Sequence, residues 1–293
     1  MSVLLVLLPV WLLGSGAAAL WYYFHLERKE ALVEQARFAK AVALPLLEDD
    51  LKKIVQIIGE RNTSSAAASE ALSRTAAMIE GLLGPSNTGY AVRRTRGPTD
   101  WPILQASIAG KSKSAPSVWV VTSYDSRPGS RGGEANASGL AATLAAAQAL
   151  AADQPDSSIH FIFLPHANDP GAPVMETAAA LNQLVKAAGT PAAVLCIEAM
   201  GAGEDLWLSS RESSARPLQQ AAGLGKIYGA EVICLNDDVD LASVLCELGL
   251  PAVRVATREM LAHDEEDEQI PSAPRIAAAT GRLMELLRRC AQK

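Results

Sequence analysis

The chain has 293 residues, of which 49% are hydrophobic and 20% are charged, so it can bury a substantial core and is not intrinsically disordered. Its net charge of −6 and its aromatic content of 5% argue against a nucleic-acid partner, which would require a basic face and stacking rings. The 4 cysteines are far apart and form no Cys-x-x-Cys pair, which argues against a disulfide scaffold or a cysteine-based zinc knuckle.

The first segment of the chain is strongly apolar. No charged residue occurs from Val3 to Phe24, and a helix of this length would cross a hydrocarbon core of about 30 Å. We therefore predict a single-pass transmembrane anchor over residues 1–26. A cleaved signal peptide is the alternative, because residues 14–19 are small and suit cleavage. The positive-inside rule places the rest of the chain in the cytoplasm, because basic residues follow the apolar segment: Arg28, Lys29, Arg37 and Lys40.

Two helices are expected next. Residues 27–60 have apolar positions at helical spacing with charges between them, which predicts an amphipathic stalk that Pro45 kinks. Residues 69–83 predict a second helix, which the Gly84-Pro85 pair ends.

From Tyr90 onward, short apolar strands alternate with helices. This alternation predicts an α/β domain, over residues 61–293, with a largely parallel sheet and helices on both faces. The expected strands are 117–122, 159–164, 192–197, 231–235 and 252–256, and the expected helices are 138–151, 175–188, 214–228 and 272–292. Ligands of such sheets gather at the carboxyl ends of the strands.

The loops after these strands carry recognisable motifs. They are Ser123-Tyr124-Asp125 with the glycine-rich stretch 129–139, the stretch Glu198-Ala199-Met200-Gly201, Gly249-Leu250-Pro251-Ala252, and His263 with Asp267. In order and spacing, residues of about 55 to 290 resemble the M28 family of zinc aminopeptidases. The resemblance implies a three-layer α/β/α sandwich with a largely parallel mixed sheet of the zinc-exopeptidase type.

The resemblance also implies which positions would hold the two zinc ions of the family. Its first histidine falls on Ser123, its bridging aspartate on Ala135, and its pair of glutamates on Ala167 and Asn168, so that the position of the catalytic base is Ala167. Glu198 and His263 are the remaining positions with a usable ligand. Since each zinc ion needs about four donors, two ligands do not hold two ions.

Three functions are consistent with this pattern. The first is a membrane-anchored, non-catalytic homologue that needs no cofactor and binds a peptide or membrane-protein partner. The second is a divergent metallo-aminopeptidase with one zinc ion, Asp169 as its base, and a shifted ligand set: Asp125, Glu134, His166, Glu198 and His263. The third is a cyclase-like transfer activity on one metal. For the side of the membrane, the family habit suggests an extracytoplasmic domain, whereas the flanking charges suggest the cytoplasm.

Overall fold

The structure is a computed structural model that describes residues 15–16, 20–25, 41–229, 240–262, 265 and 267–292. The chain divides into two compact units, Met1–Ala39 and Lys40–Lys293. Among the described residues, no helix is both long enough and apolar enough to cross a membrane. Most of the predicted anchor, residues 3–14 and 17–19, lies outside the described residues, so the anchor stays a prediction.

The second unit is built around a mixed sheet. Eight strands of the described chain form it in the order β1-β2-β4-β3-β5-β8-β6-β7. Their bounds are β1 (Arg93–Arg96), β2 (Pro102–Ile108), β3 (Val118–Ser123), β4 (Ile159–Leu164), β5 (Ala193–Ile197), β6 (Leu206–Ser209), β7 (Gly225–Tyr228) and β8 (Ala252–Ala256). The four central strands β4, β3, β5 and β8 are parallel, whereas β2 and β6 join them antiparallel.

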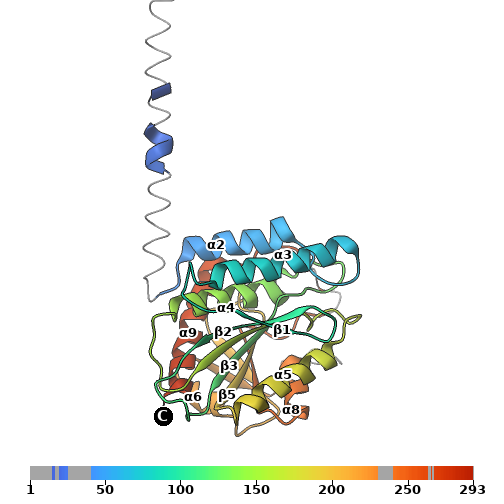
Figure 1. Cartoon of the computed structure of the whole chain (residues 1–293), viewed down its shortest axis with the longest axis vertical. Coiled ribbons are helices and arrows are strands. Elements are labelled where there is room, and N and C mark those ends of the chain that lie inside the picture. Colours follow the sequence, from blue (N-terminus) through green and yellow to red (C-terminus); the bar gives the residue numbers. More distant parts are fainter. Residues whose placement is uncertain are drawn as a thin grey trace, which may run out of the picture. The chain divides into compact units, whose positions relative to one another are not determined.

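Helices cover both faces of this sheet (Figure 1). One face is packed by α2 (Leu44–Lys52), a π-helical turn η1 (Lys53–Ile58), α3 (Ala66–Leu83), α4 (Ser138–Ala149), the short α6 (Arg216–Gln220) and α9 (Ala273–Ala291). The other face is packed by α5 (Val174–Ala188) and α8 (Leu241–Glu247). The predicted mixed α/β sheet with helices on both faces is therefore confirmed.

The central strands are apolar throughout because both of their faces are covered. All residues of β5 and β8 are buried, and so are five of the six in β3. Val120 of β3 pairs with Phe161 of β4 on one side and with Leu195 of β5 on the other. These strands match the expected ones, and the expected strand 231–235 lies outside the described residues.

The segment that the sequence indicated as a stalk is part of the domain. Its described residues form α2 and η1, and the apolar side chains Leu47, Leu51, Ile54 and Val55 are buried in the main core. Pro45 stands in the first turn of α2, where proline is tolerated, and it does not kink the helix. The boundary between the two units therefore lies at residue 40 and not at residue 60.

The helix expected over residues 214–228 is wrong in its second half. Only α6 is helical, and the chain then turns through Gly223 into β7. A Cβ atom at Gly225 would lie 2.1 Å from the carbonyl oxygen of Leu206, so glycine is required for β7 to approach β6. Tertiary pairing has therefore overridden the apparent helical spacing.

Candidate functional site

The carboxyl ends of β3, β4, β5 and β8 surround a small cleft of about 50 Å³. Each position that the resemblance assigned to a family ligand, apart from His263, lines this cleft. The lining residues include Ser123, Ala135, Ala167, Asn168 and Glu198, together with Arg127, Asn136, Asp240 and Arg254. His263 lies outside the described residues. The sequence therefore located the cleft, and the structure adds the contacts within it.

Asp125 anchors the loop after β4 through hydrogen bonds to the loop's backbone. Its carboxylate is fully buried, and its Oδ2 atom accepts hydrogen bonds from the backbone N–H groups of Ala167, Asn168 and Asp169 at 2.9, 2.8 and 3.1 Å. Burial raises the pKa of Asp125, and these hydrogen bonds partly oppose the rise. Asp125 is thus a structural anchor for the loop, and it is not among the residues that line the cleft.

Asn168 connects this anchor to the end of β3. Its Nδ2 group donates to Ser123 Oγ at 2.7 Å and to Asp125 Oδ1 at 3.0 Å. An amide and a hydroxyl therefore bond each other at two positions where the family resemblance implied metal ligands. Both groups are neutral, so they contribute little to holding a divalent cation.

Glu198 is paired with Arg254, an arginine that belongs to none of the sequence motifs. The Nε atom of Arg254 lies 2.6 Å from Glu198 Oε2, and Arg254 is 1% exposed. Burial raises the pKa of Glu198, and the positive charge of Arg254 opposes this rise. The one available signal was an arginine in the middle of the apolar strand β8, Ala-Val-Arg-Val-Ala, where a charge is costly without a partner.

Glu134 and Asp267 support the turn that precedes α4. Glu134 Oε1 accepts from the N–H of Gly201 at 2.7 Å, and the carboxylate of Asp267 accepts from the N–H groups of Glu134 and Ala135. Burial is the main reason that the pKa of Glu134 is raised to about 7. The carboxylates of Glu134 and Asp267 therefore each accept hydrogen bonds from backbone N–H groups of a different loop from their own.

The side chain of His166 forms its hydrogen bond outside the cleft. Its Nε2 atom lies 2.8 Å from the hydroxyl of Thr99, and burial lowers the pKa of the imidazole. His166 is not among the residues that line the cleft. In the described part of the chain, no group of three or more His, Cys, Asp or Glu side chains is placed to hold a metal ion.

The cleft side chains that the structure describes therefore do not fit a pair of zinc ions. Two of the assigned positions carry methyl groups, Ser123 and Asn168 bond each other, and the carboxylate of Glu198 is paired with Arg254. Zinc in proteins is bound by imidazole, thiolate and carboxylate groups that are free to donate an electron pair. The shifted ligand set stays a prediction, because His263 is not described; its other members are committed to the contacts given above.

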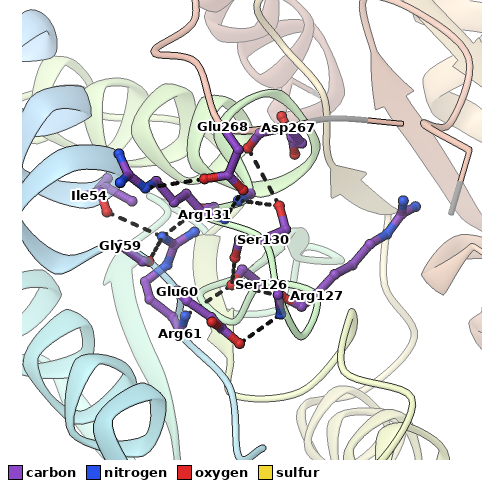
Figure 2. A network of polar contacts seen from close by, with 12 residues as sticks. Ile54, Gly59, Glu60, Arg61, Ser126, Arg127, Ser130, Arg131, Asp267 and Glu268 are labelled. Atoms are coloured by element: carbon purple, nitrogen blue, oxygen red, sulfur yellow. Dashed lines mark hydrogen bonds and ion pairs between the residues drawn. The ribbon is translucent and has the colours of Figure 1, made fainter. Parts of the chain in front are cut away.

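The glycine-rich loop beside the cleft is fastened by a buried arginine (Figure 2). Arg61 donates from Nη1 to the carbonyl oxygens of Ile54 at 3.2 Å and Arg131 at 2.9 Å, and from Nε to that of Tyr124 at 3.2 Å. Its backbone N–H also donates to Ser126 Oγ at 3.0 Å. Arg61 therefore ties the segment after η1 to both ends of the loop that leads into the site.

The described domain is a mixed α/β sheet with helices on both faces, and its fold matches zinc-exopeptidase-like folds. The LapA aminopeptidase of Legionella pneumophila superposes with a TM-score of 0.65 at 12% identity, over 92% of this chain and 75% of that one. A glutaminyl cyclase of Tannerella forsythia gives 0.61 at 14% identity, over 85% and 99% of the two chains. A leucine aminopeptidase precursor of Bacteroides thetaiotaomicron gives 0.59 at 14% identity, over 86% and 98%.

The sequence comparison agrees with these structural likenesses. Residues 104–166, from β2 to the loop after β4, match the family described as Peptidase family M28. No curated protein matches the chain in sequence. The resemblance to peptidase family M28 is therefore confirmed over residues 104–166, and the fold of the domain is similar to those of the aminopeptidases and the glutaminyl cyclase named above.

Proposed function

We propose that this chain is a non-catalytic homologue of the M28 peptidases that binds a peptide or protein partner. The observation that carries the proposal is the Glu198–Arg254 ion pair in the cleft. In a metal site, a metal cation would neutralise a carboxylate at this position. Here the guanidinium group of Arg254 neutralises Glu198 instead. It also repels any metal ion that approaches the same carboxylate.

The absence of a base at the assigned position supports the same proposal. Ala167 lines the cleft with a methyl group, which cannot take a proton from water. Loss of a general base alone lowers the rate of such reactions by about 10²–10⁴-fold. A site without that base, and without free ligands among its described residues, retains a shaped cleft, and such a cleft suits binding.

We also propose that residues 1–26 anchor the protein in a membrane, with a single span from Val3 to Phe24. The proposal rests on the length of this uncharged apolar segment. A reporter fused to the C-terminus would give the side on which the domain lies. If the protein is released from membranes by alkaline carbonate, the anchor is disproved.

Metal content tests the non-catalytic function. Full-length protein is incubated with excess zinc, separated from free metal and analysed for zinc, beside an active M28 aminopeptidase that is treated identically. We expect well below one zinc ion per chain, and no hydrolysis of aminoacyl fluorogenic substrates. One zinc ion per chain that is lost in His166→Ala would overturn the proposal and support the shifted single-metal site.

Turnover that disappears with a chelator would also overturn the proposal. His160→Ala is the matched control for His166→Ala, because His160 lies on β4 and bonds Ser107 at 2.8 Å, away from the cleft. Loss of zinc in both variants would indicate damage to the fold, and then zinc binding by the unsubstituted protein would decide between the proposals.

A further inference from the structure

The guanidinium of Arg254 has hydrogen-bonding capacity that the protein does not use. Its Nε atom donates to Glu198 and its Nη1 atom donates to the carbonyl oxygen of Arg258 at 3.0 Å. Its Nη2 atom is buried and has no hydrogen-bond partner in the described part of the chain. Leaving a charged donor unpaired in the interior is costly, so a partner for this nitrogen is expected in the cleft that Arg254 lines.

We infer that this cleft binds a carboxylate group through Arg254, either at the C-terminus of a peptide or on a small free acid. The inference rests on the non-catalytic function proposed above, to which it adds the chemical class of the ligand. The Nε and Nη1 atoms already donate within the protein, so Nη2 is left to donate a charge-assisted hydrogen bond to an oxygen of the carboxylate.

Further donors of the cleft suit the same ligand. The hydroxyl oxygen of Ser123 accepts from Asn168, so its own hydrogen is available to donate. Arg127 is held at the wall by hydrogen bonds from Nη1 to the carbonyl oxygen of Ala262 and from Nη2 to that of Leu261, at 2.7 and 2.6 Å. Its fixed positive charge favours an anion in the cleft without the entropy cost of ordering a long side chain.

The two carboxylates in the lining are already engaged. Glu198 is paired with Arg254, and Asp240 accepts from the N–H and hydroxyl groups of Ser243 at 2.7 and 2.9 Å. With Arg127 and Arg254 they form a balanced set of two positive and two negative groups. The unpaired donor is what gives this balanced set a preference for an acceptor.

Asn136 also lines the cleft, and its Oδ1 atom has no partner among the described residues. A rotation of the amide would present its NH₂ group to the ligand instead.

The size of the cleft limits what enters it. A volume of about 50 Å³ has room for roughly three or four water-sized groups, which suits a carboxylate with its adjoining carbon. The remainder of a peptide would have to lie outside the cleft. We therefore expect the terminal charge to be recognised and side chains further along the peptide to contribute little.

Three probes test the inference on the full-length protein by isothermal titration calorimetry. They are the tripeptide Ala-Ala-Ala, the same peptide with an amidated C-terminus, and sodium acetate. Titrations include 1,10-phenanthroline, a chelator without carboxylates, so that metal-dependent turnover does not interfere. We expect the free acid to bind at least about tenfold more tightly than the amide, which corresponds to one charge-assisted hydrogen bond.

Two variants assign the effect to Arg254. Glu198→Gln removes the charge that neutralises the guanidinium, so it should tighten binding of the free acid several-fold. The double variant Glu198→Gln with Arg254→Gln leaves no unpaired charge in the interior and should bind acid and amide equally. Arg211→Gln is the matched control, because Arg211 is paired with Glu247 on the exposed surface and does not line the cleft.

Equal binding of acid and amide by the unsubstituted protein would overturn the inference, and so would discrimination that survives in the double variant. Acetate that binds as tightly as the tripeptide would support the inference with a small acid as the ligand. Tighter binding of the tripeptide would support a peptide terminus. Zinc-dependent hydrolysis with unchanged acid-over-amide discrimination would remove the non-catalytic function and leave the carboxylate site standing, so the two failures are distinguishable.

Discussion

Arg61 is a buried cation whose side-chain hydrogen bonds go to backbone carbonyl groups. Its guanidinium contacts carbonyl oxygens from η1 and from the glycine-rich loop (Figure 2). It also contacts the carbonyl oxygen of Tyr124, the residue after β3. Burial lowers its pKa to about 10, and the nearby carboxylates of Asp125 and Asp267 oppose this. Arg61 therefore stays charged at neutral pH, and removing it would strand several buried carbonyl groups.

Arg61→Met is expected to lower the free energy of unfolding by about 3 kcal/mol or more, because buried acceptors lose a charged donor. Urea denaturation followed by circular dichroism measures this. Arg74→Met is the control, since Arg74 lies exposed on α3 in a pair with Glu70, and its loss should cost about 0.5 kcal/mol or less. Similar values for the two variants would contradict the role given to Arg61.

Asp50 should make the stability of the protein depend on pH. It is 5% exposed in α2, and burial raises its pKa from 3.8 to about 7. Between these two pH values the folded state holds a proton that the unfolded state releases, so stability falls as the pH rises through this window. Asp50→Asn should remove this loss and raise the free energy of unfolding at pH 8 by about 1–3 kcal/mol.

The measurement is urea denaturation of both proteins between pH 4 and pH 8. The two curves should converge at the acidic end, where the aspartic acid is neutral in both states. Glu134, whose pKa is also raised to about 7, contributes in the same direction and is unchanged in the variant. A constant difference between the two curves at all pH values would show that the titration of Asp50 is not the cause.

At the scale of single elements, α4 is placed against the site by a glycine. A Cβ atom at Gly139 would lie 2.4 Å from the carbonyl oxygen of Glu198, at the end of β5. The small residue therefore allows the start of α4 to approach the backbone that carries the ion pair. In α9, by contrast, a Cβ atom at Gly281 would meet nothing within 4 Å beyond its own turn of the helix.

These two helical glycines make a matched pair of substitutions. Gly139→Ala should destabilise the protein by about 2–3 kcal/mol, because either the helix or the end of β5 has to move. Gly281→Ala should stabilise it by about 0.5–1 kcal/mol through helix propensity alone. Thermal unfolding of both variants checks the two signs, and a stabilising Gly139→Ala would contradict the close approach.

At the scale of the whole molecule, we expect the segment before residue 61 to be needed for the domain to fold. Leu47, Leu51, Ile54 and Val55 are buried in the core that also contains α4 and α9. At about 1.5–3 kcal/mol each, these four side chains contribute about 6–12 kcal/mol. This is comparable to the entire stability of a typical domain, about 5–15 kcal/mol.

A chain that begins at Lys40 should therefore fold cooperatively, and one that begins at Ser64 should not. The second truncation also removes Arg61 and its contacts to the loop before α4. Circular dichroism with a thermal melt distinguishes the two outcomes. A cooperative transition in the chain from Ser64 would show that residues 44–61 are a stalk after all.

The amino-acid sequence by itself determined the central strands and the place of the cleft. The apolar runs of β3, β4, β5 and β8 are long enough and uniform enough to be recognised, because both faces of these strands are covered. The motifs that follow these strands predicted one shared site for Ser123, Ala135 and Glu198, and the three residues line the same cleft.

Only the tertiary structure decided what the side chains of the site contact. The pairing of Arg254 with Glu198 joins two residues 56 positions apart, and Arg61 reaches Tyr124 over 63 positions. No local pattern encodes such contacts, because they depend on which strands become neighbours in the sheet. For the same reason, the sequence did not predict that α2 and η1 pack into the core. It also did not predict the strand β7, which depends on pairing with β6.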